Sequence, residues 1–243
     1  EVGSRFFETG VKNGVLFVQG EDGKYENGVV WNGLTAVTES PSGAEATPLY
    51  ADDMKYVVLY STEEFGATVE AYTYPEEFEQ CDGSAALMDG ITIGQQPRKS
   101  FGLVYKTVIG NDVQGQDLGY KIHIIYGAKA APSEKAFATI NDSPEAVTFS
   151  WEVSTVPVPV EGHKPTSTLV IDSTKVDAEK LAAIEAKLFG SESEESSLPL
   201  PDEIAQMINL AIKQHETVVS EGETIVIPEK IVEVDSTLKE VTE

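Results

Sequence analysis

Cysteine, histidine and basic residues are scarce in this 243-residue chain, and each shortage limits the classes of protein to which it can belong. The single cysteine, Cys81, has no partner for an intrachain disulfide, so we expect a protein made and folded in a reducing cytosol. No run of about 18 apolar residues occurs, which excludes a membrane-spanning helix. The N-terminal stretch lacks a basic segment followed by an apolar core, so we expect no secretory signal peptide.

Positive charge is the most conspicuous shortage. Lysine and arginine together number 17 against 41 aspartates and glutamates, which gives a net charge of −24 at pH 7. Duplex DNA carries one negative charge per roughly 1.7 Å, and proteins bind it through lysine and arginine. The balance therefore argues strongly against a DNA-binding module. Two interpretations remain open: the charge keeps the protein soluble, or repulsion of a polyanion is itself useful to its function.

The motifs of the common enzyme classes are also missing. The sequence contains no nucleophile elbow, P-loop, dinucleotide fingerprint or zinc-protease helix. His123, His163 and His215 lie far apart, and none has a second ligand type at metal-binding spacing. Cys81 lies in what reads as a flexible polar loop without a nearby histidine, so we expect a passive thiol. We predict that the protein is not an enzyme and has no catalytic residues, metal or cofactor.

Apolar and polar residues alternate in much of the chain from Val15 to Val160. The segment "VTFSWEVST" places Trp151 on an inward face and Glu152 on an outward face, and "TVEAYTY" separates Val69 from Glu70 in the same way. A period of two with β-branched and aromatic residues is typical of half-buried antiparallel strands. We therefore predict a mainly β fold, an antiparallel β-sandwich or half-barrel. Further predicted elements are the strands "GVVWNGLTAVTES", "FGLVYKTVIG", "MKYVVLYS" and "TSTLVIDS", and a wide hairpin connection, "IGNDVQGQDLGY".

The pattern changes to a helical period in the last third of the chain. Leu181, Ile184 and Leu188 fall on one helical face and Gly190 is a natural stop, which predicts a flanking helix from about Asp177 to Phe189. An acidic serine-rich spacer follows, and Pro201 begins a second predicted helix. The end of the chain predicts a small hairpin or an arm that docks elsewhere. We divide the chain into a β-sandwich domain (1–190), the acidic spacer and second helix (191–213) and a C-terminal extension (214–243).

A long connection, Tyr74–Gly102, interrupts the strands. Loops longer than about 12–15 residues inside a compact domain are usually functional or disordered. A disordered linker would not carry so many apolar residues, so we predict that this loop packs on a neighbouring subunit. The alternative is that it folds back over its own sheet. The predicted contact residues are Asp82, Leu87, Met88, Ile91, Ile93, Arg98 and Lys99.

A resemblance to a known family rests on whole segments rather than on one short motif. The segments are "SRFFETGVKNGVLFV", "ENGVVWNGLTAVTESPSGAEATPLYADDMKYVVLYSTEEFGATVEAYTYPEEFEQCDGS", "ITIGQQPRKSFGLVYKT", "IGNDVQGQDLGYKIHIIYGAKAAPSEKAFATINDSPEAVTFSWEVSTVPV" and "KPTSTLVIDS". They closely resemble the major tail proteins, or tail tube proteins, of siphovirus-type phages, whose tails are long, flexible and non-contractile, from Gram-positive hosts. The resemblance runs without large gaps from about Ser4 to Phe189, and "LPLPDEI" is similar to the usual family ending.

The resemblance implies a virion structural protein that is made in the host cytoplasm. Members of the family form hexameric rings that stack into a hollow tube, and the sheets of the subunits join into one continuous inner β-barrel. A long loop between two strands reaches toward the adjacent ring, and we assign that role to Tyr74–Gly102. The implied partners are further copies of the chain, a tape measure protein, and tail terminator and distal tail proteins. DNA passes through the lumen during ejection without specific binding, and no membrane is involved.

The negative charge fits such a lumen, because acidic groups that face the bore would keep DNA from adhering. Glu70 and Glu152 point outward from predicted strands and are the candidates for the lining; the tube exterior is the alternative position for each. A competing hypothesis is a secreted or surface β-sandwich that binds carbohydrate or protein ligands. Such modules usually expose aromatic platforms, whereas Trp31 and Trp151 both lie within strand patterns.

Overall fold

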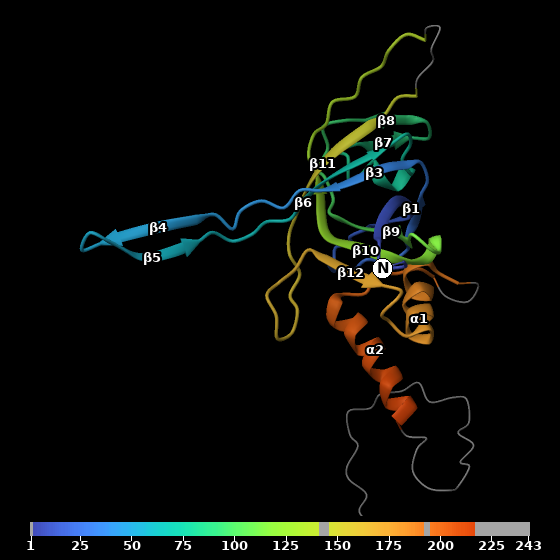
Figure 1. Ribbon diagram of the computed structural model, residues 1–243. Helices are drawn as coiled ribbons and strands as arrows, with labels where there is room; N and C mark the ends of the chain where they lie inside the picture. The colour runs from blue at the N-terminus through green and yellow to red at the C-terminus, as the bar shows by residue number, and fades with distance from the viewer. Residues whose placement is uncertain (1, 141–145, 192–194, 217–243) are drawn as a thin grey trace, which may run out of the picture.

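The computed structural model describes residues 2–140, 146–191 and 195–216 (Figure 1). Within these ranges the chain is mainly β, as predicted, with an eight-stranded antiparallel sheet, two separate two-stranded hairpins and two α-helices that follow the strands. The large sheet has the strand order β2-β1-β9-β10-β11-β6-β3, and β12 pairs with β10 beside this path. Its strands are β1 (Phe6–Val18), β2 (Val29–Trp31), β3 (Leu34–Glu39), β6 (Gly66–Ala71), β9 (Phe101–Asn111), β10 (Gly115–Ala130), β11 (Phe149–Thr155) and β12 (Thr168–Asp172).

The long strand β10 connects two layers of the fold. Its first part, Lys121–Ile125, pairs with β12, and its last part, Ala128–Ala130, pairs with β11. Between them the register with β9 shifts, and Gly127 has a φ of 58°. A side chain at Gly127 would collide with the backbone of Val156, so the bulge requires glycine. This bend lets β11, β6 and β3 fold over β1, β9 and β10 as the second layer of a sandwich.

Two apolar cores lie on opposite faces of β9 and β10. One fills the sandwich and includes Leu103, Tyr105 and Trp151. The other lies between the sheet and the helices and includes Val104 and Ile122. We predicted that the strand "FGLVYKTVIG" is half-buried, and this is wrong for residues 101–105, which are buried on both faces. The reason is that the helices cover the face that alternation alone would leave to solvent.

The helix α1 (Ala178–Phe189) confirms the predicted flanking helix. The Asp177 carboxylate accepts hydrogen bonds from the backbone N–H groups of Glu179 (3.0 Å) and Lys180 (3.4 Å), which is an N-cap. Gly190, with a φ of 77°, follows its last turn. Leu181, Ile184 and Leu188 are buried, as the helical period predicts. The second helix, α2 (Pro201–Glu216), begins at the predicted proline and contributes Ile204 to the same core.

The connection between β3 and β6 projects far from the body as a two-stranded ribbon (Figure 1). It consists of β4 (Ala46–Ala51) and β5 (Met54–Tyr60), and we call residues 45–61 the arm. Asp52 and Asp53 form its two-residue turn with φ values of 51° and 58°, the left-handed geometry that hairpins favour. The segment "MKYVVLYS" is thus a strand, as predicted, but it belongs to the arm rather than to the sheet.

Two connections differ from the sequence-based prediction. The predicted wide turn after β9 is short, because β9 continues to Asn111 and β10 already begins at Gly115. The Asn111 side chain holds this turn by accepting hydrogen bonds from the backbone N–H groups of Val113 (3.1 Å) and Gln114 (2.6 Å). Cys81 is fully buried in the first core rather than placed in a flexible loop. Residues 217–243, with the predicted hairpin or arm, lie outside the described residues.

Candidate assembly surfaces

The arm exposes apolar side chains on both faces. Tyr56, Tyr60 and Tyr50 are 76%, 72% and 70% exposed. The exposed large apolar residues of the arm are Leu49, Tyr50, Met54, Tyr56, Val57, Leu59 and Tyr60. An isolated two-stranded hairpin is at best marginally stable, and exposed apolar patches mark interaction sites. The arm is therefore the strongest candidate for a surface that is covered in an assembly.

Specific hydrogen bonds fix the direction in which the arm leaves the body. The backbone N–H of Glu45 donates to Ser61 Oγ (2.9 Å), and the N–H of Ser61 donates to the Glu45 carbonyl (3.1 Å). Ser42 and Glu64 form a reciprocal backbone pair closer to the sheet, at 2.8 Å in each direction. Since β3 and β6 are neighbours in the sheet, the arm continues an existing strand pair. Sequence analysis missed this surface, although the apolar run "YVVLY" beside polar turn residues is a usable signal.

The predicted contact loop contains a second, smaller hairpin of β7 (Ala85–Met88) and β8 (Ile91–Ile93). It brings together the four apolar residues that the sequence singled out. Leu87 and Met88 are 62% and 58% exposed, and Ile91 and Ile93 are also exposed. Their contact with a neighbouring subunit stays a prediction.

The charged residues of the same loop lie differently. Asp82 is buried, and its Oδ1 accepts hydrogen bonds from Trp151 Nε1 (3.0 Å) and, at the limit of hydrogen-bonding distance, from Arg98 Nη1 (3.5 Å). The ammonium group of Lys135 donates to its other oxygen, Oδ2. Arg98 also donates to the carbonyl of Ala130 (3.3 Å). Asp82 and Arg98 are thus engaged within the subunit, whereas Lys99 is exposed.

Glu70 and Glu152 lie on one face of the β11–β6 pair. Ser150 pairs with Glu70 and Thr68 pairs with Glu152, so the two carboxylates belong to adjacent positions of the same face. The residues of this face on β3, β6 and β11 are Ala36, Thr38, Thr68, Glu70, Ser150, Glu152 and Ser154, which are polar or small. Lys129 of β10 lies at its border, opposite Ser154. The inward-facing neighbours Val69 and Trp151 are buried, so the predicted orientation is confirmed, while the lumen assignment stays a prediction.

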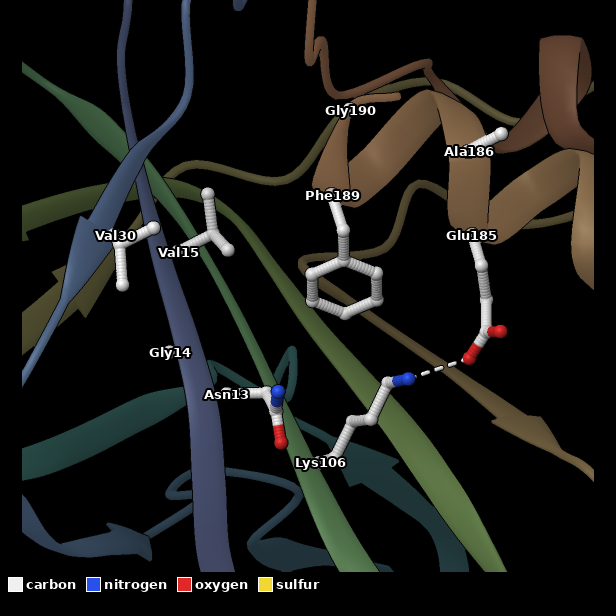
Figure 2. A pocket seen from close by; sticks show the side chains of 9 residues that line it. All are labelled: Asn13, Gly14, Val15, Val30, Lys106, Glu185, Ala186, Phe189 and Gly190. Carbon is white, nitrogen blue, oxygen red and sulfur yellow. Dashed lines mark hydrogen bonds and ion pairs between the residues drawn. The ribbon is translucent and has the colours of Figure 1, made fainter. Parts of the chain in front are cut away.

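A concave site of about 440 Å³ lies between β1 and α1 (Figure 2). Lys106 reaches across it to Glu185 (2.5 Å) and lies over the rings of Tyr120 (4.6 Å) and Phe189 (4.4 Å). Lys106, the cation that the described residues contribute to this site, is thus neutralised by its own chain, and its aromatic contacts are already made.

Among the described residues, the cysteine and histidine side chains that could take part in chemistry are not arranged for catalysis. Burial raises the pKa of the Cys81 thiol to about 12, so the reactive thiolate is suppressed. His123 lies stacked on Tyr105, with its Nε2 2.9 Å from Thr107 Oγ1 and 3.2 Å from Glu8 Oε1. In the part of the chain that the structure describes, no group of three or more histidine, cysteine, aspartate or glutamate residues could hold a metal ion. No described helix is long and apolar enough to cross a membrane.

The two tryptophans are interior residues. Trp151 is fully buried and Trp31 is 2% exposed. The indole N–H of Trp31 donates to the Thr73 carbonyl (2.9 Å), and the two rings contact edge to face with centroids 5.7 Å apart. Neither tryptophan can serve as the exposed platform that a carbohydrate-binding module needs.

No protein-family model matches the sequence, and no curated protein matches it. A similar solved structure is the cryo-EM structure of an extracellular contractile injection system, the PVC sheath-tube complex in its extended state. The identity is 13%, the match covers 66% of this chain and 88% of that chain, and the TM-score of 0.29 is too low to establish a shared fold.

Proposed function

We propose that this chain is the structural subunit of a phage tail tube, in which stacked hexameric rings surround an acidic lumen that conducts DNA during ejection. The observation that carries the proposal is the arm, a projecting ribbon whose apolar side chains remain exposed in the single subunit. We take the arrangement in stacked hexameric rings from the resemblance of residues 4–189 to major tail proteins. The partners are further copies of the chain and the tape measure, terminator and distal tail proteins of the virion.

Open strand edges give the subunits a way to join within a ring. The path of the large sheet ends at β2 and β3, whose outer edges have no partner among the described strands. Open edges in an isolated protein are an aggregation hazard, and closure into a barrel removes them. Edge-to-edge pairing between identical subunits would satisfy these backbone groups and form a continuous inner wall.

The arm supplies a contact between rings in addition to the one predicted for the β7–β8 hairpin. Full burial of one large apolar side chain stabilises a complex by roughly 1.5–3 kcal/mol. The arm carries seven such side chains, so its burial against another ring offsets the loss of translational and rotational freedom on assembly. The net charge of −24 opposes association until these contacts form together.

The acidic groups account for passage of DNA without adhesion. Glu70 and Glu152 lie on a polar sheet face that no apolar residue of β3, β6 or β11 larger than alanine interrupts. Electrostatic repulsion at physiological salt acts over about 8 Å, which suits a bore only slightly wider than duplex DNA. We assign this face to the lumen.

Electron microscopy of the concentrated purified protein tests the proposal, with rings or tubes as the expected result. A variant in which a short Asn-Gly turn replaces the arm should fold, because among the described strands β4 and β5 pair only with each other, but it should remain monomeric. Circular dichroism and size-exclusion chromatography measure the two properties. A wild-type protein that stays monomeric, or an armless variant that still builds tubes, would overturn the proposal.

A further inference from the structure

A second concave site, which we call the groove, lies between β12, β10 and α2. It has a volume of about 560 Å³. Its apolar lining includes Leu169, Val170, Ile204 and Ile208, and two lysines, Lys121 and Lys175, belong to its border. Val170 is 51% exposed although it is the central residue of β12, so the described residues leave this apolar side chain half uncovered.

The described residues of the groove offer one accessible ammonium group, that of Lys175, in a strongly acidic protein. Lys121 Nζ lies 2.5 Å from Glu8 Oε2, so its charge is already paired. Lys175 is the other lysine of the lining, and its neighbouring carboxylate is that of Asp172. The Lys175 side chain is 79% exposed and 3.5 Å from Asp172, so this ion pair is weak and leaves the ammonium group accessible. The site beside α1 has no comparable group among the described residues, because its lysine is paired with Glu185 as Lys121 is with Glu8.

The tip of the arm has the complementary chemistry. Its turn consists of two aspartates, Asp52 and Asp53, for which the described residues provide no basic partner. Tyr50 and Met54 flank the turn and are 70% and 68% exposed. The tip therefore presents two acidic groups near two large apolar side chains, with Lys55 paired opposite Tyr50. The groove presents apolar walls beside an accessible lysine.

We propose that the groove receives the arm tip of a second copy of this chain, with Tyr50 and Met54 between β12 and α2 and the turn aspartates beside Lys175. The inference rests on the proposed function, since it names the acceptor for the arm. The chain's own arm leaves the body away from α2, so the occupant is another copy (Figure 1). Arm and groove are different surfaces, so a one-way contact between them continues from copy to copy, whereas a reciprocal exchange of arms would close as a dimer.

Engineered cysteines test the contact directly, because the only native thiol, Cys81, is buried. In assembled Met54→Cys/Val170→Cys protein, mild oxidation should give a ladder of covalent oligomers on non-reducing gels. Each single variant and a Met54→Cys/Met88→Cys control should give none. Tubes in which the 54/170 pair does not cross-link, or in which the 54/88 pair does, overturn the groove assignment but leave the tube function intact. Absence of any assembly overturns both.

Charge reversal is the second measurement. Lys175→Glu should raise the protein concentration needed for assembly at low salt by about fivefold, the effect of losing one exposed ion pair. Adding Asp53→Lys to the same chain should restore assembly. Lys24→Glu, on an exposed loop outside the groove, is the control with the same change in net charge. Equal effects of Lys175→Glu and Lys24→Glu, or no rescue by Asp53→Lys, would contradict the proposal.

Discussion

At the scale of single residues, Asp82 joins parts of the chain that are far apart in sequence. Its carboxylate contacts Trp151 of β11, Arg98 before β9 and Lys135 after β10. The side chain of Asp82 is 6% exposed, whereas those of Arg98 and Lys135 reach partly into solvent. A buried carboxylate is stable only when its hydrogen-bonding capacity is filled, and here three donors from three segments fill it.

Replacement of this carboxylate should destabilise the subunit. Asp82→Ala leaves the Trp151 indole N–H without its acceptor and removes the carboxylate that pairs with Arg98 and Lys135, so we expect the free energy of unfolding to fall by about 2–4 kcal/mol. Urea denaturation followed by tryptophan fluorescence measures the change. Asp89→Ala, in the exposed turn between β7 and β8, is the matched control and should alter stability by less than about 0.5 kcal/mol. Equal stability of the two variants would show that the Asp82 network contributes nothing.

Buried thiol and phenol groups make the fold sensitive to alkali. Burial raises the pKa of Cys81 from its ordinary 9.0 to about 12, and burial together with the Glu185 carboxylate raises the pKa of Tyr120 from 10.0 to about 12. The folded state therefore favours the neutral forms. Their contribution to stability is complete below the unfolded pKa values and is lost as the pH rises through the folded ones.

The urea midpoint should accordingly fall as the pH rises from about 9 to about 12. Cys81→Ser removes one of these groups, so the slope of stability against pH should be shallower in that variant over the lower part of the range. A thiol reagent at pH 8 should label native Cys81 slowly and the urea-unfolded chain rapidly. Rapid labelling of the native protein would contradict the burial argument.

At the scale of elements, the two exposed hairpins differ in what their removal would do. The arm can be shortened without loss of a core residue, whereas the loop Tyr74–Gly102 contains Phe78, Cys81 and Asp82, which are buried. Deletion of the whole loop would unfold the subunit and would say nothing about its interface. Point changes in β7 and β8 separate the two effects.

We expect the triple variant Leu87→Ser, Met88→Ser and Ile91→Ser to fold normally but to assemble poorly. The three side chains are about half exposed or more, so their loss should change the free energy of unfolding by less than about 1 kcal/mol in total. Tube yield by electron microscopy and unfolding by urea are compared with wild type. Normal tubes from a stable variant would remove this hairpin from the interface and leave the arm as the contact.

At the scale of the whole molecule, charge and apolar surface act against each other. In the proposed assembly the net charge of −24 opposes contact between subunits, while the arm and the edges of β2 and β3 that are open among the described strands favour it. Salt screens the repulsion but not the apolar contacts. Tube formation should therefore be favoured as ionic strength rises.

The sign of the charge matters most on the face that carries Glu70 and Glu152. With both changed to lysine, tubes should still form, because neither side chain contributes to an apolar core, but DNA should adhere to the bore. Phage carrying the double variant should eject DNA more slowly. Glu21→Lys/Asp22→Lys, on an exposed loop before β2, is the control with the same change in charge. Unchanged ejection by the Glu70/Glu152 variant would exclude both residues from the lining.

The sequence by itself determined the local elements of this protein. Alternation along a strand places Trp151 inward and Glu152 outward, because successive side chains of a pleated strand point to opposite faces. The Asp177 cap and the Gly190 stop of α1 depend on neighbours within one or two helical turns. A short stretch of sequence therefore contains everything needed to predict these features. The same holds for the four apolar residues that the β7–β8 hairpin brings to the surface.

Only the tertiary structure decided which partners these elements meet. Alternation shows that a strand has an apolar face, but it does not show that β5 pairs with β4 outside the sheet or that helices cover the second face of β9. Asp82 looks like a surface residue because its three donors come from segments that are distant in the sequence. Strand pairing and burial depend on contacts between such segments, and no local pattern encodes them.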